Sequence, residues 1–241
     1  MKKLHLIFML LVLFLAVSCT KDKTTTPTIT PEKTCLVQKV DYTDNRSDVF
    51  TYDTKNRLIK TVIIQDTMLS QTDMSYNGNI VTTSINGMPF SLTYLNAKGF
   101  ADSVVSSFQG IIETKTVYTY NSNGLLISLS IKGMQFGRPI NELLTFEYVG
   151  ENKSKQTYSD GTDSYTTVYE YYLDRKNNLK KSQEAQYFEN ANANLVKIAT
   201  IDFDDITNYT YEFNSDGLET KRVAIRGATQ TYTNIYTWSC K

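Results

Sequence analysis

Few side chains in this sequence of 241 residues could support chemistry. The single histidine, His5, stands in an N-terminal apolar segment that we expect to be removed from the mature chain. Without imidazole, neither a Ser-His-Asp or Cys-His site nor a zinc site with histidine ligands can form. We therefore expect no catalytic residues, no metal site and no cofactor.

Acidic residues are the next candidates. Asp202, Asp204 and Asp205 could contribute to a Ca²⁺ site, and strand alternation would place Asp202 and Asp204 on one face and Asp205 on the other. Calcium needs about six to eight oxygen ligands, usually from a glycine-containing loop, so solvated carboxylates are the favoured interpretation. The stretch 160–163 is interpreted as a turn. A carboxylate pair could still hydrolyse glycosides, but no pair among the 25 acids stands out.

Cys35 and Cys240 could form a disulfide in an exported protein. They stand in the first and last predicted strands, so a bridge requires those strands to be neighbours, as closure of the sheet into a barrel would make them. The alternative is two unpaired thiols at opposite edges of an open sheet.

The chain that must position these residues is built from predicted hairpins. In the stretch 117–131, Tyr118 and Tyr120 alternate with smaller residues, 121–124 has turn composition, and alternating aliphatics follow. If Tyr120 pairs near Leu125, one face carries both tyrosines together with Leu125, Ile127, Leu129 and Ile131.

Copies of this unit recur along the chain, with an aromatic-x-aromatic pattern followed by Asn or Asp and, three residues later, Gly or Asn. The copies lie at 49–64, 74–85, 91–107, 145–158, 168–183 and 209–225. Consecutive hairpins predict an all-β fold, an antiparallel up-and-down meander of about 14 strands that forms one large curled sheet or a barrel. The tyrosine rows could stack on sugar rings, but cross-strand pairing on a core face is the favoured interpretation. The longer spacing at 184–208 predicts a strand at 195–203 and either an extra hairpin or a lid.

Residues 1–18 have the composition of a signal peptide, with Lys2 and Lys3 before an apolar run. Its end, Ala16-Val17-Ser18-Cys19, resembles the lipobox of bacterial lipoproteins, which implies lipidation of Cys19. The alternative is an ordinary signal peptide. Residues 19–34 are predicted to be a flexible Thr/Pro-rich tether, and residues 35–241 a single β domain.

Two family resemblances follow from these motifs. The stretch 52–58 resembles the Tyr-Asp-x-x-Gly-Arg-Leu motif of YD (RHS-type) repeats, with Asn56 in place of Gly. The mature chain is similar to uncharacterised Bacteroidota lipoproteins described as a domain of unknown function with a porin-like β-fold. This resemblance implies an outer-membrane location with a lipid anchor, on the periplasmic face or the cell surface.

The resulting function hypotheses belong to three classes. The first is a non-enzymatic scaffold that binds a ligand or partner, such as a glycan or an envelope protein. The second is a carrier that holds an apolar molecule such as a lipid on the concave face, and the third is a carboxylate-based glycoside hydrolase. The formal net charge is zero and basic-aromatic patches are missing from the sequence, so nucleic acid is not an expected partner.

Overall fold

The computed structural model describes residues 34–181, 187–188 and 192–241. Residues 1–18, Cys19 and nearly all of the tether, residues 19–33, lie outside the described residues. The strands are β1 (Cys35–Tyr42), β2 (Arg46–Tyr52), β3 (Leu58–Gln65), β4 (Met68–Asn77), β5 (Ile80–Ile85), β6 (Met88–Leu95), β7 (Ala101–Phe108), β8 (Ile112–Tyr120), β9 (Leu126–Gln135), β10 (Arg138–Val149), β11 (Asn152–Ser159), β12 (Ser164–Lys176), β13 (Asn194–Ile201), β14 (Asp205–Phe213), β15 (Glu219–Arg226) and β16 (Gln230–Cys240). A short 3₁₀ helix, η1 (Asn178–Lys181), follows β12.

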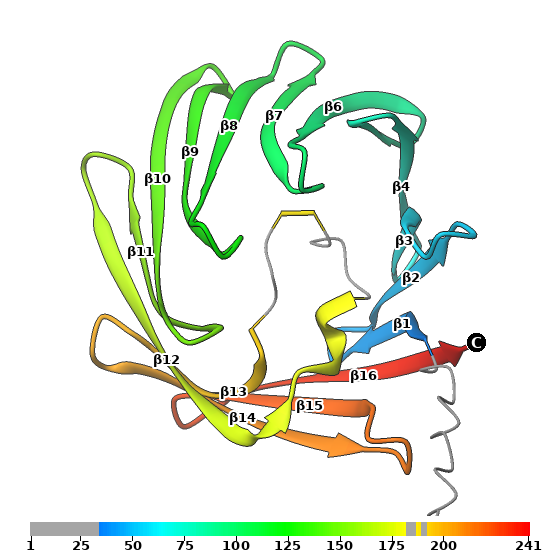
Figure 1. Cartoon of the computed structure of the whole chain (residues 1–241), viewed down its shortest axis with the longest axis vertical. Helices are drawn as coiled ribbons and strands as arrows, with labels where there is room; N and C mark the ends of the chain where they lie inside the picture. Colours follow the sequence, from blue (N-terminus) through cyan, green and yellow to red (C-terminus); the bar gives the residue numbers. More distant parts are fainter. Residues whose placement is uncertain (1–33, 182–186, 189–191) are drawn as a thin grey trace, which may run out of the picture. The chain divides into compact units, whose positions relative to one another are not determined.

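Each strand pairs antiparallel with its neighbours in the sequence, and β1 pairs with β16, so the sheet closes into a barrel (Figure 1). The predicted all-β meander is confirmed, and closure decides between the curled sheet and the barrel. The barrel has 16 strands rather than about 14. We call the end at which β1 begins and β16 ends the cysteine end, and the opposite end the far end.

The hairpin at 117–131 has the predicted turn but a different register. The Asn121 side chain accepts hydrogen bonds from the backbone N–H groups of Asn123 and Leu125, and Gly124 has a φ of 80°. Tyr120 pairs with Leu126, next to Leu125 as predicted, but the pairing then skips Ile127. This β-bulge turns Ile127 toward solvent, so the prediction that four aliphatic residues share the tyrosine face was wrong for Ile127.

The same bulge recurs around the cysteine end of the barrel. Seven strands skip one residue of the ladder there, directly after Val37, Leu58, Ala101, Leu126, Lys153, Val196 and Glu219. The carbonyl group of each of these residues accepts a hydrogen bond of 2.6–2.9 Å from an aromatic side chain of the next strand in the chain. The donors are Tyr52, Tyr76, Tyr120, Tyr148, Tyr171, Tyr211 and Trp238.

These seven pairs form what we call the bulge ring. A bulge disrupts the ladder and leaves backbone groups in need of other partners, and a buried carbonyl without a partner is costly. The phenol and indole groups supply those partners. The aromatic rows of the sequence are therefore structural parts of the barrel, as the favoured interpretation held.

The interior of the barrel is filled at one side by an apolar cluster. Val37, Val40, Leu58 and Val81 from the wall pack with Leu179 of η1 and with Tyr187. Figure 1 shows η1 and residues 187–188 inside the ring of strands. The wall holds this inner segment by its backbone, because Ala101 N–H donates to the Tyr187 carbonyl group at 2.7 Å.

The structure describes part of the stretch 184–208, for which the sequence predicts a strand and either an extra hairpin or a lid. The predicted strand is present as β13. The Tyr120 hydroxyl group donates to the Phe188 carbonyl group, and the Phe188 ring stacks on Tyr118 with centroids 5.3 Å apart. Residues 182–186 and 189–191 lie outside the described residues, so the choice between an extra hairpin and a lid stays a prediction. Tyr187 and Phe188 lie inside the barrel against its wall.

Candidate functional site

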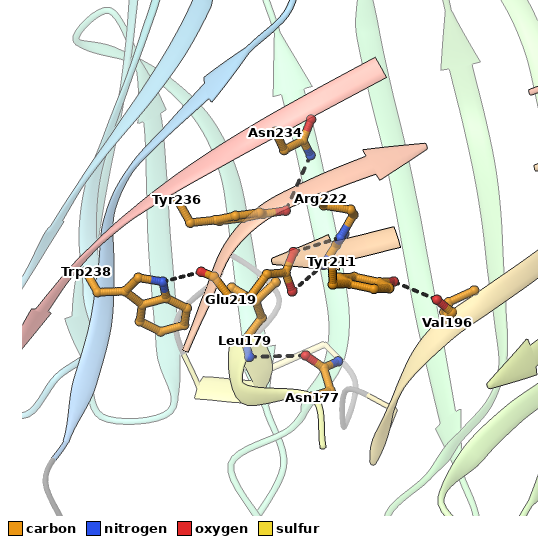
Figure 2. Close-up of polar contacts among 9 residues, drawn as sticks. All are labelled: Asn177, Leu179, Val196, Tyr211, Glu219, Arg222, Asn234, Tyr236 and Trp238. Atoms are coloured by element: carbon orange, nitrogen blue, oxygen red, sulfur yellow. Dashed lines mark hydrogen bonds and ion pairs between the residues drawn. The ribbon is translucent and has the colours of Figure 1, made fainter. Parts of the chain in front are cut away.

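A buried ion pair forms the centre of the candidate site on the luminal face of β15. Glu219 is 1% exposed. Its carboxylate accepts hydrogen bonds from Nε and Nη2 of Arg222, at 3.0 and 3.3 Å (Figure 2). The Arg222 guanidinium group lies 5.4 Å from the ring centre of Tyr211 and 5.6 Å from that of Tyr236, so two aromatic faces flank the cation.

Local sequence explains why Glu219 is held there. The Asn214 side chain accepts hydrogen bonds from the backbone N–H groups of Asp216 and Leu218, which fixes the turn before β15. Glu219 starts the strand at a bulge, and Trp238 Nε1 donates to its carbonyl group at 2.6 Å. The bulge ring therefore positions the acid of the candidate site.

Burial determines the electrostatics of this cluster. It raises the pKa of the Glu219 carboxyl group, and the positive charge of Arg222 only partly opposes this effect. Burial alone would lower the pKa of Arg222, but Tyr236, Glu219 and Tyr211 outweigh it and raise that pKa. Arg222 therefore stays charged, and its attraction keeps the charged form of Glu219 accessible.

A hollow of about 230 Å³ opens beside Arg222 on the luminal face. It is lined by Thr207, Tyr209, Arg222, Ala224, Arg226, Tyr232 and Asn234, from β14, β15 and β16. The second cation, Arg226, is paired with Asp205 through Nε, at 2.8 and 2.9 Å from the two carboxylate oxygens. The wall thus offers guanidinium, amide and hydroxyl groups together with two phenol rings, and its two cations are balanced by acids.

These groups suit a small polar ligand with a flat face. Arginine and asparagine donate to hydroxyl or carboxylate oxygens, and a tyrosine ring packs against the apolar face of a ring-shaped ligand. The hollow is smaller than the roughly 300–1,000 Å³ of sites for drug-sized ligands, so it fits one compact ring and not a long chain.

A second luminal ion pair lies on β2. Arg46 donates to Asp48 from Nε at 2.9 Å and from Nη2 at 2.7 Å, and the Tyr42 hydroxyl group donates to the same carboxylate at 2.9 Å. Arg46 also lies 4.6 Å from the ring centre of Tyr42. The acids Asp48, Asp205 and Glu219 of the inner wall therefore all have arginine partners.

The acids that the sequence singled out are not brought together. Asp202 and Asp204 lie in the turn between β13 and β14, so strand alternation does not apply to them, and that part of the prediction was wrong. The Asp202 side chain accepts a hydrogen bond from Thr166 N–H, and Asp205 pairs with Arg226. Within the described ranges, the structure contains no group of three His, Cys, Asp or Glu side chains that could hold a metal ion.

Two other predicted features have clear places in the fold. The stretch 160–163 is a turn, as predicted, in which the Asp160 side chain accepts hydrogen bonds from Thr162 and Asp163 N–H groups. Cys35 and Cys240 are register partners on β1 and β16, and their sulfur atoms are joined at 2.07 Å.

The residues of the hollow were missed by sequence reasoning. Arg222, Ala224 and Arg226 alternate along β15 and share the face of Tyr211 on β14. One signal in the sequence could have revealed them. The hairpin prediction assigns the arginines of β15 to the inner face of the sheet. The ion pairs gave no local pattern, because Asp205 and Arg226 lie on neighbouring strands and are 21 residues apart in the sequence.

The luminal tyrosines make the barrel sensitive to high pH. Burial raises the pKa of Tyr118 from 10.0 to about 12 and also raises the pKa values of Tyr52 and Tyr211. Since the neutral phenol is favoured in the folded state, this stabilisation is complete below pH 10 and is lost as the pH rises toward 12. Tyrosinate absorbance of these residues should therefore appear together with loss of the β-sheet circular dichroism signal. Their ionisation in an intact barrel would contradict this expectation.

Comparisons with known proteins agree with the fold. No protein-family model matches the sequence, and a comparison with curated proteins finds no relative. No helix in the part of the chain that the structure describes has the length and apolar character needed to cross a membrane. Among solved structures, the chain is similar to a porin-like protein from Bacteroides uniformis, with a TM-score of 0.65 and 16% identity, over 84% of this chain and 98% of that one. A porin-like protein from Bacteroides vulgatus gives a TM-score of 0.59 and 13% identity, over 86% and 99% of the two chains. At this identity the likeness establishes a shared barrel fold.

Proposed function

We propose that this protein is a non-enzymatic cell-envelope barrel that binds a small polar, ring-shaped ligand, a glycan unit, in the luminal hollow beside Arg222. The observation that carries the proposal is the hollow itself. Tyr209 and Tyr232 supply ring faces there, and Arg222, Arg226 and Asn234 supply hydrogen-bond donors. This combination of flat apolar faces and fixed donors matches a sugar ring, which has both hydroxyl groups and apolar C–H faces.

The polar lining favours a glycan over the two other classes of function. A carrier for an apolar molecule needs a wall of aliphatic side chains, whereas two arginines and an asparagine line this hollow. A glycoside hydrolase needs a pair of acids free to act as proton donor and nucleophile or base. Asp205 and Glu219, the acids that pair with the two arginines of the hollow, are both engaged by those arginines.

We further propose that a lipid on Cys19 anchors the barrel, with residues 1–18 as the signal peptide and 19–34 as the tether. Charged pairs near the cysteine end of the outer wall favour an anchor over insertion of that part of the barrel. Phe146 is buried, so Glu147, the next residue of the strand, lies on the outer face, where it pairs with Lys155 at 3.0 Å. Glu212 pairs with Lys221 at 2.8 Å. A membrane-embedded barrel needs an apolar outer band, in which such charges are costly.

The resemblance of the stretch 52–58 to YD repeats also belongs to this proposal. Tyr52 donates to Val37 in the bulge ring, and the Asp53 side chain accepts hydrogen bonds from Lys55 and Arg57 N–H groups in the turn. The tyrosine of the motif therefore joins two strands, and the aspartate stabilises the turn. Both roles are expected of a repeated hairpin unit.

A binding screen with variants tests the ligand. Neutral and acidic monosaccharides and short glycans should be titrated into the mature protein by calorimetry. We expect replacement of Tyr232 by alanine to weaken binding of the best ligand by about tenfold or more, because the substitution removes a ring face of the hollow. The matched control is Tyr94→Ala, because Tyr94 follows the buried Thr93 and lies on the outer wall.

Three results would decide against parts of the proposal. If no glycan binds, or if Tyr232→Ala and Tyr94→Ala behave alike, the hollow is not a glycan site. Lipid found by mass spectrometry in the purified protein, and retained in Arg222→Leu, would instead support the carrier. For the anchor, a fatty-acid label should be incorporated into the wild-type protein and should be absent from Cys19→Ala.

A further inference from the structure

The turns at the far end of the barrel expose large apolar side chains. Phe203 is 93% exposed and Phe136 71% exposed, and at the start of β4 Met68 and Leu69 are 68% and 62% exposed. Phe203 and Phe136 belong to turns 202–204 and 136–137, and Met68 and Leu69 follow turn 66–67. Leu173 and Val149, at 79% and 73% exposure, lie near the cysteine end, so the far end holds most but not all of the strongly exposed apolar side chains. A concentration of large apolar side chains at one end of a protein indicates an interaction site.

The backbone at both phenylalanines makes their presence more informative. Phe203 has a φ of 77° and Phe136 a φ of 52°, in the left-handed region that favours glycine or asparagine. Asp202 precedes Phe203 with a φ of 46°, so the pair occupies the turn positions for which Asn-Gly is the usual solution. Phe203 is neither buried nor suited to its turn, so the requirements of folding do not explain its presence.

The charge of the same turns indicates the kind of partner. The eight far-end turns, residues 43–45, 66–67, 86–87, 109–111, 136–137, 160–163, 202–204 and 227–229, contain no lysine or arginine. They contain six exposed acids, Asp44, Asp66, Asp160, Asp163, Asp202 and Asp204. Two of these flank Phe203. Arg46, Arg138 and Arg226 stand directly beside these turns, but Arg46 and Arg226 are paired with Asp48 and Asp205, so the excess charge of this end is negative. Apolar side chains beside an excess of negative charge match a surface that is apolar and positively charged, and they repel an anionic membrane.

We propose that the far-end rim, made of these eight turns and the first two residues of β4, is a docking surface for a protein partner whose contacting segment is both apolar and cationic. Phe203 and Phe136 are the anchoring side chains, and the aspartates select positive charge. Aromatic anchors surrounded by polar groups are typical of binding hot spots. This inference does not depend on the luminal ligand.

A pair of substitutions separates docking from folding. Phe136→Asn combined with Phe203→Asn removes both anchors, while asparagine tolerates the left-handed backbone. The melting temperature should therefore be unchanged or higher. The matched control is Val117→Thr with Leu143→Thr, which removes apolar side chains of 44% and 45% exposure from the outer wall.

Three synthetic peptides serve as probes against the full mature protein, with fluorescence anisotropy as the readout. The first is an amphipathic peptide of leucine and lysine, the second has glutamate in place of lysine, and the third has serine in place of leucine. We expect only the leucine-lysine peptide to bind. The double asparagine variant should weaken its binding by about tenfold or more, and the outer-wall control should bind as the wild type does.

Several outcomes would overturn the proposal. The first is equal binding of the glutamate peptide, and the second is unchanged affinity in the double asparagine variant. A fall in melting temperature of that variant would show that the phenylalanines serve the fold. Binding of phosphatidylcholine vesicles that disappears in the same variant would make the rim a membrane-contact surface instead of a protein-docking one.

Discussion

Replacing both Cys35 and Cys240 with serine should lower the free energy of unfolding by up to about 5 kcal/mol. The two residues are 205 positions apart, so the bond closes almost the whole domain into one loop and removes much of the conformational entropy of the unfolded chain. The bond also holds the β1–β16 seam, the pairing that turns an open sheet with two edges into a barrel without edges. Urea unfolding of the wild type and the double variant measures the difference.

Reduction provides the control for this prediction. The wild type in excess reductant should unfold at the urea concentration of the double variant, and reductant should not affect the variant. The seam retains other contacts, including reciprocal backbone hydrogen bonds of 3.2 and 2.9 Å between Thr34 and Lys241, so a folded but less stable barrel is expected. Alkylation of both thiols in the folded, non-reduced wild type would contradict the prediction.

Replacing Gly133 with alanine should lower the free energy of unfolding by about 3 kcal/mol or more. Gly133 lies within β9, between Thr114 of β8 and Ile140 of β10, with a φ of 147°. A Cβ atom at this position would stand 2.0 Å from the Glu113 carbonyl oxygen and 2.8 Å from the Thr114 Cα atom. Both are backbone atoms, so the two strands would have to separate and lose ladder hydrogen bonds.

Gly137, in the turn between β9 and β10, is the matched control. It has a φ of 74°, but a Cβ atom there would meet nothing within 4 Å. Alanine at position 137 should therefore lower the free energy of unfolding by about 1–2 kcal/mol, because only the left-handed backbone conformation is unfavourable there. Equal losses for the two variants, measured by chemical denaturation, would mean that the close approach of β8 to Gly133 is unimportant.

Much of the fold could be predicted from the sequence because its signals are local. Alternation of Tyr118 and Tyr120 and the turn chemistry of Asn121 and Gly124 specify a hairpin without reference to the rest of the chain. Bulges are different, since the carbonyl group of Ala101 is satisfied by Tyr120, 19 residues away. No local pattern predicts the skipped residue, so the outward position of Ile127 could not be predicted.

The candidate site could be predicted only in part. The inward face of β15 follows from alternation, but the pairing of Arg222 with Glu219 depends on a bulge that moves Glu219 onto that face. The inner segment is a similar case. Tyr187 carries no periodic signal of its own, and its burial depends on the space that 16 strands leave inside the barrel.

The bulge ring has a consequence for how this barrel could be altered. Because its seven contacts lie around the cysteine end, the register of the hairpins is fixed there, and the far-end turns are not needed to define it. A peptide inserted between Gly161 and Thr162 should therefore leave the barrel folded, whereas the same insertion between Ser122 and Asn123 would disrupt the turn that joins Tyr120 to its ladder partner Leu126 at the bulge. The barrel is thus a scaffold whose geometry is fixed at the cysteine end and whose far end can accept inserted loops.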